Sequence, residues 1–255
     1  MSSPVKHIGK HIVVSGGGSG VGAEIAKHFA LTGAKVTILG RREAPLDAVA
    51  KATGALAICC DVTERASVDA ALDQAREVHG PITVSVANAG AAVSKPFAKM
   101  QAEDVVAIMN VNVLGVFNLW QASLPDMQDE GWGRMIAIAS TAGLKGYPYV
   151  SSYCAAKHGV IGLTRSLAIE LARTGITVNS ICPGFVETPM LSASIENIVE
   201  KTGMSVEDAA KSLKSGNPMK RFIQVDEVAS AVVWLASNVT ASINGQAVSI
   251  NGGEV

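Results

Sequence analysis

The stretch HIVVSGGGSGVG, residues 11–22, decides the fold of this chain. An apolar run of strand length leads directly into a glycine-rich turn, and an apolar helix pattern over residues 21–31 follows. Glycines in such a turn let the backbone approach a pyrophosphate, and the N-terminus of the next helix offers N–H groups and a positive dipole to the anion. A flexible glycine-rich turn is the alternative, but the order strand, turn, helix favours a nucleotide-binding unit.

Further apolar runs alternate with helical patterns along the rest of the chain. Strand-like runs lie at residues 35–39, 56–59, 82–86, 135–139, 177–181 and 247–250. Helical patterns lie at residues 66–78, 102–127, 153–172 and 225–236. This alternation indicates βαβ units with right-handed crossovers. No repeat or low-complexity linker divides the chain, so we predict one α/β domain over residues 1–255, a doubly wound, Rossmann-like parallel sheet.

The composition fits a sheet that helices cover on both faces. Of the 255 residues, 48% are hydrophobic and 17% are charged. With 21 Lys and Arg against 22 Asp and Glu, the net charge of -1 gives no electrostatic basis for binding nucleic acid or an anionic membrane. Residues 1–10 lack the apolar segment of a secretory signal, and no run of about 18 apolar residues occurs. We therefore predict a soluble cytoplasmic protein.

The cysteines and histidines show no metal-binding pattern. The cysteines lack paired CxxC spacing and are interpreted as buried free thiols: Cys59, Cys60, Cys154 and Cys182. No pair of the five histidines has ligand spacing in a plausible site. The sequence therefore predicts no metal.

Residues 190–222 interrupt the alternation after Pro183 and Gly184. Ser205 and Asp208 have the spacing of a helix-start capping box, so the segment is predicted to be a helical insertion. Loops at the carboxyl ends of strands surround the ligand in open α/β sheets. We predict a helical substrate lid here; a packed surface hairpin is the alternative.

Gly40, Arg41 and Arg42 follow the second strand, where NAD-binding proteins usually place an acidic residue against the adenosine ribose. Glycine offers no carboxylate, and two guanidinium groups suit a phosphate. We therefore predict a preference for NADP over NAD, with Arg41 as the chief contact. Both arginines could instead be solvated residues that open the next helix.

Tyr153 and Lys157 stand four residues apart, and Ser140 precedes the tyrosine by thirteen residues. Positions i and i+4 share one face of a helix, so the Lys157 ammonium is expected to lie beside the Tyr153 phenol and to favour its ionised form. Alone, this spacing is also typical of a solvated pair on an amphipathic helix. Together with a nucleotide-binding turn, it indicates carbonyl chemistry.

These motifs, taken in order, resemble the short-chain dehydrogenase/reductase family along nearly the whole chain. The family's TGxxxGxG turn corresponds to a segment with serine in place of threonine: Ser15, Gly16, Ser19, Gly20, Val21 and Gly22. The resemblance implies further cofactor contacts at Asp61, Val62, Asn88, Ala89, Gly90, Pro183, Gly184, Val186 and Thr188. It also implies a catalytic tetrad of Asn112, Ser140, Tyr153 and Lys157. Thr141 and Asn110 compete chemically, but the family spacing selects Ser140 and Asn112.

The family resemblance implies a role for each member of the tetrad. Tyr153 would exchange a proton with the carbonyl or alcohol oxygen, and Ser140 would hold that oxygen by a hydrogen bond. Lys157 would bind the nicotinamide ribose and stabilise tyrosinate, and Asn112 would support a water for proton relay. The cofactor supplies the hydride chemistry.

The expected reaction is reversible interconversion of a secondary alcohol and a ketone. Residues 187–190 and 217–221 resemble 3-hydroxyacyl-CoA dehydrogenases and 3-oxoacyl thioester reductases, so the expected substrate is a small-molecule 3-hydroxyacyl or 3-oxoacyl thioester. A cyclic or aryl secondary alcohol is the alternative, and a regulatory protein that binds NADP without catalysis is a second alternative. Members of the family commonly pair two long helices, here residues 102–127 and 153–172, which implies a homo-oligomer, often a tetramer.

Overall fold

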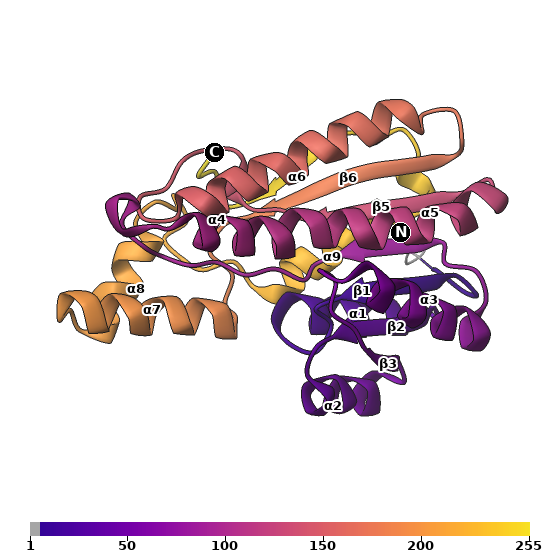
Figure 1. Cartoon of the computed structure of the whole chain (residues 1–255), viewed down its shortest axis with the longest axis horizontal. Coiled ribbons are helices and arrows are strands. Elements are labelled where there is room, and N and C mark those ends of the chain that lie inside the picture. The colour runs from indigo at the N-terminus through magenta and orange to yellow at the C-terminus, as the bar shows by residue number, and fades with distance from the viewer. Residues whose placement is uncertain (1–5) are drawn as a thin grey trace.

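The computed structural model describes residues 6–255, and residues 1–5 of the predicted domain lie outside it. Seven parallel strands form one sheet in the order β3-β2-β1-β4-β5-β6-β7 (Figure 1). Their bounds are β1 His11–Ser15, β2 Lys35–Gly40, β3 Leu56–Cys59, β4 Val84–Ala87, β5 Gly133–Ile138, β6 Ile176–Pro183 and β7 Ala247–Ile250. The strand order reverses between β1 and β4, and ligands of open α/β sheets bind at such a switch point. The predicted doubly wound fold is confirmed.

Helices cover both faces of the sheet and bury two separate hydrophobic cores. The α-helices are α1 Gly20–Leu31, α2 Glu43–Thr53, α3 Arg65–His79, α4 Ala102–Met109, α5 Gly115–Asp129, α6 Ser151–Glu170, α7 Pro189–Thr202, α8 Val206–Lys214 and α9 Val225–Leu235. Side chains of α3, α5 and α6, including Leu72, Trp120 and Val160, form one core. Side chains of α1, α2 and α9, including Phe29 and Leu46, form the other. Strands β1, β4, β5 and β6 contribute to both cores, which is why they read as continuous apolar runs.

Several boundaries differ from the expected ones by one or two residues, the usual uncertainty at the ends of elements. The largest omission was α2, whose bounds the sequence did not indicate because it buries only Leu46. Short 3₁₀ turns also lie at η1 Phe97–Lys99, η3 Thr141–Gly143 and η4 Asn238–Thr240. Among the cysteines, the expectation of burial was wrong for Cys59, which is exposed at the end of β3.

The long helical pattern at residues 102–127 is one continuous helix in which α4 and α5 are joined by a π-helical turn, η2 Asn110–Leu114. The run Ala102–Asp129 is the one described helix that is long and apolar enough to cross a membrane by length and composition, and 44% of its most apolar window is buried inside the protein. It packs against β4, β5 and α6. Core helices of globular proteins have the same composition.

The segment after β6 forms α7 and α8, which project together at one end of the molecule (Figure 1). Of their side chains, Leu191 and Ala209 are buried. The Ser205 hydroxyl caps α8 by accepting a hydrogen bond from the Asp208 N–H at 3.1 Å. Asp208 accepts from the Ser205 hydroxyl at 2.8 Å, so the capping residues are the expected ones. The predicted helical insertion is thus a pair of helices.

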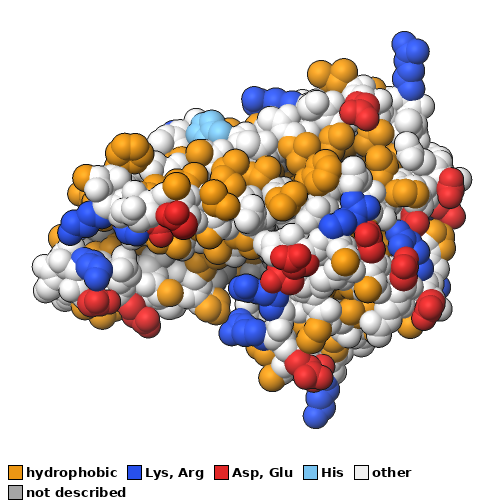
Figure 2. Space-filling view, viewed as in Figure 1, with side chains coloured by type: hydrophobic (Ala, Val, Ile, Leu, Met, Phe, Trp, Pro, Cys, Tyr) orange, Lys and Arg blue, Asp and Glu red, His pale blue; other side chains and the backbone are white. Residues whose placement is uncertain are grey.

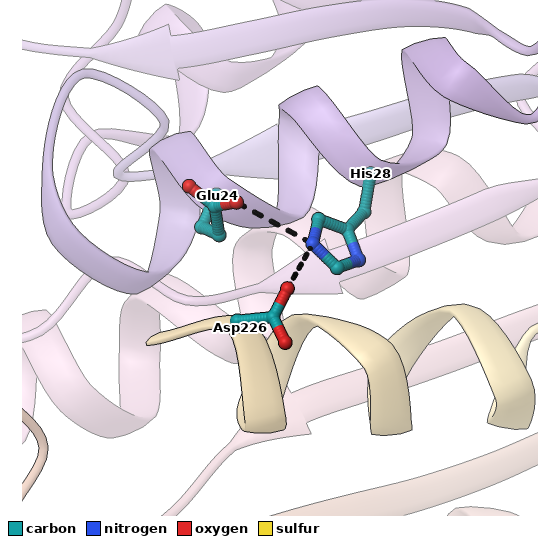
Figure 3. Close-up of side chains that lie close together, drawn as sticks. All are labelled: Glu24, His28 and Asp226. Carbon is teal, nitrogen blue, oxygen red and sulfur yellow. Dashed lines mark ion pairs between the residues drawn. The ribbon is translucent and has the colours of Figure 1, made fainter. Parts of the chain in front are cut away.

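An ion-pair cluster joins α1 to α9 (Figure 3). His28 Nε2 lies 2.9 Å from Asp226 Oδ1 and 3.4 Å from Glu24 Oε1. Within residues 6–255, this is the one group whose ligand atoms lie close enough together to hold a metal ion. Lys27 also pairs with Glu24 at 2.9 Å, so Glu24 has a cationic partner without a metal. The cluster connects α1 to α9, the helix that follows the insertion.

Candidate active site

The glycine turn between β1 and α1 is held by close backbone contacts. A Cβ on Gly22 would lie 2.3 Å from the Gly16 carbonyl oxygen, so only glycine lets α1 begin this close to the turn. Gly16 itself has a φ of 66°, in the left-handed region. The turn therefore requires glycine at positions 16 and 22, because a side chain at either would force the backbone to move.

Ser15 and Asn88 clasp this turn to the end of β4. The buried Ser15 hydroxyl accepts hydrogen bonds from the Asn88 and Ala89 N–H groups, both at 3.0 Å. The Asn88 side-chain amide donates to the Ser15 and Gly16 carbonyls at 2.9 and 3.2 Å. Both side chains thus bond to the protein itself, and their part in a cofactor site is to position the turn.

A groove of about 200 Å³ opens beside the turn, and it contains most of the residues expected at the adenosine end. Predicted residues that line it are Gly16, Ser19, Arg41, Arg42, Asp61, Val62, Ala89 and Gly90. Gly18 and Gly40 also line it, and the sequence named them as part of the turn and as the position after β2 without listing them as contacts. The sequence missed Pro45, Leu46, Cys60 and Val111. Leu46 and Val111 come from helices, and nothing in their local sequence distinguishes them from core residues.

Asp61 is fixed at one wall of the groove. Its carboxylate accepts from the Thr63 N–H at 3.0 Å and the Thr63 hydroxyl at 2.8 Å. The Thr63 N–H is the main reason that the pKa of Asp61 is lowered, and the positive charge of Arg41 adds to it. A carboxylate and two guanidinium groups therefore face the same groove.

Ser140, Tyr153 and Lys157 meet where β5 ends and α6 begins. Ser140 caps the turn η3, with its hydroxyl accepting from the Ala142 N–H at 3.1 Å. The Lys157 ammonium lies 5.5 Å from the centre of the Tyr153 ring and donates to the Ile138 carbonyl at 2.8 Å. Tyr153 is half-buried and Lys157 is buried. The structure thus brings the three predicted side chains together.

Burial is the main influence on the pKa values of Tyr153 and Lys157. It raises the pKa of Tyr153 to about 12, although a hydrogen bond with Ser140 acts in the opposite direction. Burial also lowers the pKa of Lys157 to about 8. The net pKa shift of Tyr153 is therefore upward, whereas the spacing with Lys157 led us to expect a shift towards the ionised form, because the loss of solvation is the largest effect.

Asn112 lies in the π-helical turn, and its side chain lies near Gly90 and Lys157. Its side-chain amide donates to the Ala91 and Ile108 carbonyls at 2.8 and 2.9 Å. Its Oδ1 atom is buried and has no hydrogen-bond partner within residues 6–255. A Cβ on Gly90 would lie 2.8 Å from this oxygen and 3.7 Å from Lys157 Nζ. The structure therefore leaves a buried acceptor beside the ammonium, where a polar group or water fits.

The segment after β6 closes the site from the other side. Pro183 ends β6, and Val186 pairs with Ile223 across an isolated parallel bridge. Thr188 caps α7, donates to the Val186 carbonyl at 3.2 Å, and lies 3.3 Å from the position that a Cβ would take on Gly20. Gly184, Val186 and Thr188 thus run from the sheet edge to the glycine turn. The two ends of the expected cofactor site are connected along the same edge of the sheet.

Residues 10–199 match the family described as short chain dehydrogenase, which is more than half of the chain. The protein belongs to the short-chain dehydrogenase family. It is therefore an oxidoreductase, as the order of its motifs predicted, and its family binds NAD or NADP.

Known short-chain dehydrogenases match it along almost their full length. The D-beta-hydroxybutyrate dehydrogenase of Rhizobium meliloti is 34% identical over 96% of this chain and 98% of its own. The 3-oxoacyl-(acyl-carrier-protein) reductase of Thermotoga maritima is 34% identical over 97% of this chain and 98% of its own. A crystal structure of a variant of actinorhodin polyketide ketoreductase with NADPH superposes with a TM-score of 0.93 at 35% identity, covering 96% of this chain and 97% of that one.

Proposed function

We propose that this short-chain dehydrogenase interconverts 3-oxoacyl and 3-hydroxyacyl thioesters with NADP(H). The observation that carries the proposal is the meeting of Ser140, Tyr153, Lys157 and Asn112 at the end of a groove that two arginines line. The names of the relatives, a hydroxybutyrate dehydrogenase and a 3-oxoacyl reductase, support the same class of substrate.

Tyr153 is the proton donor in the direction of reduction. With a pKa of about 12, the phenol stays protonated at neutral pH and has a proton to give. The Ser140 hydroxyl lies close to the phenol, so both can donate hydrogen bonds to one carbonyl oxygen. As that oxygen gains negative charge, two preorganised donors stabilise it.

Lys157 and Asn112 return the proton to Tyr153. A Lys157 pKa of about 8 leaves the ammonium mostly protonated at neutral pH and able to release a proton above it. The Asn112 oxygen, which has no hydrogen-bond partner in the described part of the chain, would accept a hydrogen bond from a water beside the ammonium. Lys157 would also donate to the ribose hydroxyls of the cofactor, and its positive charge would oppose the effect of burial on the Tyr153 phenol.

The residues present fit a dinucleotide, because the glycine turn leaves a cradle that a Cβ would fill and the groove continues to Arg41 and Arg42. Gly16, Ser19, Gly20, Val21 and Gly22 would hold the pyrophosphate, and Asp61, Val62, Ala89 and Gly90 the adenosine side. Pro183, Gly184, Val186 and Thr188 would hold the nicotinamide side. When bound, the nicotinamide supplies or accepts the hydride. The arginines at the groove support NADP over NAD.

Residues 190–222 act as a substrate lid in this proposal. Their helices α7 and α8 follow Thr188 directly and bury few side chains. Segments that open and close over ligands have few buried apolar contacts. Hydrogen exchange with and without cofactor and substrate tests the lid: we expect slower exchange across α7 and α8 in the ternary complex, and unchanged exchange would contradict it.

A homotetramer in the cytoplasm completes the proposal. Hydrophobic side chains gather over the long helix (Figure 2), and the exposed hydrophobic residues of that helix include Val105, Val106, Leu114 and Phe117. Exposed apolar patches of this kind are typical of subunit interfaces. Sedimentation at several concentrations measures the state directly.

A panel of substrates tests the proposed function. Acetoacetyl-CoA, a 3-oxoacyl-carrier thioester and simple cyclic ketones are each reduced with NADPH and with NADH. We expect the highest kcat/KM with a thioester and NADPH. Faster turnover of the cyclic ketones would identify a cyclic or aryl secondary alcohol and its ketone as the substrate class instead. Better use of NADH would reject the preference for NADP. Tight cofactor binding without any turnover would favour a non-catalytic NADP-binding protein.

A further inference from the structure

A buried carboxylate outside the predicted tetrad lies beside the active-site loop. Glu254 belongs to the segment that follows β7, and its side chain is only 3% exposed. Asn251 bends this segment, because its Oδ1 accepts from the N–H groups of Gly253 and Glu254 at 3.0 and 3.2 Å. The bend turns Glu254 back into the protein.

Glu254 binds two side chains of the loop between Ser140 and Tyr153. The Tyr147 hydroxyl donates to Glu254 Oε1 at 2.6 Å, and Lys145 Nζ lies 3.0 Å from the same oxygen. The Tyr147 oxygen is also 2.8 Å from the Thr141 hydroxyl, next to Ser140. Burial, and then the bond to Glu254, raise the pKa of Tyr147. The phenol is thus held as a donor to the carboxylate.

The same carboxylate fills space against two other segments of the site. A Cβ on Gly184, after β6, would lie 3.4 Å from Glu254 Oε2, and one on Gly216, after α8, would lie 3.1 Å from Glu254 Oε1. Nearby, a Cβ on Gly252 would lie 2.3 Å from Asn217 Oδ1, so the segment after β7 packs tightly on the end of the insertion. Three segments next to the proposed substrate site therefore meet at one side chain.

The Tyr147 ring is fixed by these contacts. It packs edge-on against Phe185, with ring centres 6.1 Å apart, and Lys145 Nζ lies 5.0 Å from its centre. A buried carboxylate is stable only where cations and donors satisfy it, and the loss of one partner leaves the others unpaired. Removal of the Glu254 charge would therefore release Lys145 and Tyr147 together.

We propose that Glu254 is a positioning residue of the active site, which holds the loop carrying Tyr147 against Gly184 and Gly216 and so keeps the substrate wall in one arrangement. This inference rests on the proposed carbonyl reduction for its kinetic consequence. Glu254 touches none of the tetrad directly, so its effect is on the binding of the ketone rather than on proton transfer.

Steady-state kinetics of Glu254→Gln test the proposal, because glutamine keeps the shape and removes the charge. We expect KM for the ketone substrate to rise about tenfold, with kcat and the NADPH dissociation constant little changed. Tyr147→Phe should raise KM similarly, and the double variant should be no worse than either single variant by more than about twofold, because the two act as one unit. Glu130→Gln, an exposed charge at the far end of α5, is the matched control and should keep the wild-type KM.

A purely structural role gives a different result: Glu254→Gln would lower the melting temperature and leave KM per folded enzyme unchanged, which would overturn the proposal.

Hydrogen exchange tests the positioning role of Glu254 without any measurement of activity. We expect faster exchange in residues 141–150 and 214–218 of Glu254→Gln, with α9 unchanged, and wild-type exchange in both segments would overturn the proposal. A wild-type protein that turns over no carbonyl substrate would reject the proposed function alone, since the exchange result would still decide the role of Glu254.

Discussion

The two ends of the ligand-binding edge are built in different ways. At the nucleotide end, partly buried hydrogen bonds of Ser15 and Asn88 fix a glycine turn against the sheet. At the substrate end, α7 and α8 bury little, and their side-chain hydrogen bonds are largely within the insertion itself. The first end is preformed by backbone geometry, whereas the second is defined by side chains from distant segments, with Glu254 among them. This difference separates a fixed cofactor site from an adaptable substrate site.

A methyl group in the glycine turn should weaken the binding of NADPH. In Gly22→Ala, the new Cβ would lie 2.3 Å from the Gly16 carbonyl, so the turn has to move. We expect NADPH affinity to fall by about 100-fold, the loss of one or two phosphate contacts. Fluorescence titration measures it.

Gly162→Ala is the matched control, because a Cβ there meets nothing within 4 Å. It should bind NADPH as the wild type does. Wild-type affinity in Gly22→Ala would show that the turn is adaptable after all.

Low pH should reduce the stability of the fold, because His11 in β1 is buried and neutral. His11 begins β1, is buried, and bonds to Gly80 and Thr37 at 2.8 and 2.9 Å. Burial lowers its pKa from 6.5 to about 4, so between these values the unfolded chain binds more protons than the folded one. The free energy of unfolding should therefore fall by up to about 3 kcal/mol as the pH falls from 6.5 to 4.

Urea unfolding of wild type and His11→Gln between pH 7 and pH 4.5 checks this. The variant should lose less stability on acidification, although His7 and His79, whose pKa values are also lowered, keep part of the slope. An unchanged slope in His11→Gln would mean that His11 does not couple to folding.

Arg41 should set the choice of cofactor. We expect Arg41→Ala to reduce the preference for NADPH over NADH, as a ratio of kcat/KM values, by about tenfold, because one charge-assisted phosphate contact is lost. Lys51→Ala, on the exposed side of α2, should not change the ratio. An Arg41→Ala variant that keeps the wild-type ratio would place the phosphate elsewhere.

Loss of the N-terminal cap of α8 should have the smallest effect, a local loss of stability within that helix. Ser205→Ala removes the hydroxyl that accepts from Asp208, at a cost of about 1 kcal/mol to the helix. Hydrogen exchange across residues 206–214 should quicken while the global free energy of unfolding stays unchanged. A global loss of the same size would show that the insertion folds as part of the core, which would remove the difference between the two ends.

The sequence was sufficient where structure depends on local pattern. Apolar runs gave the strands, and the glycine turn at residues 16–22 gave the nucleotide end, because both depend on neighbours along the chain. Thr188, which meets Gly20 at the turn, could be named only through the family resemblance.

The sequence was insufficient where the answer depends on burial or on distant contacts. Spacing placed Lys157 beside Tyr153, yet the pKa of Tyr153 rises because the loss of solvation, which spacing does not reveal, is the larger effect. Tyr147 and Glu254 are 107 positions apart, and no pattern joins them. The substrate end is therefore the part that needed a structure.

The most direct test of the central claim is Tyr153→Phe, which deletes one hydroxyl from the site. NADPH oxidation with a 3-oxoacyl thioester is followed alongside NADPH binding in the wild type and the variant. If Tyr153 donates the proton, kcat falls by about 1,000-fold while the NADPH dissociation constant stays within about twofold of the wild-type value. Turnover near the wild-type rate would contradict the account.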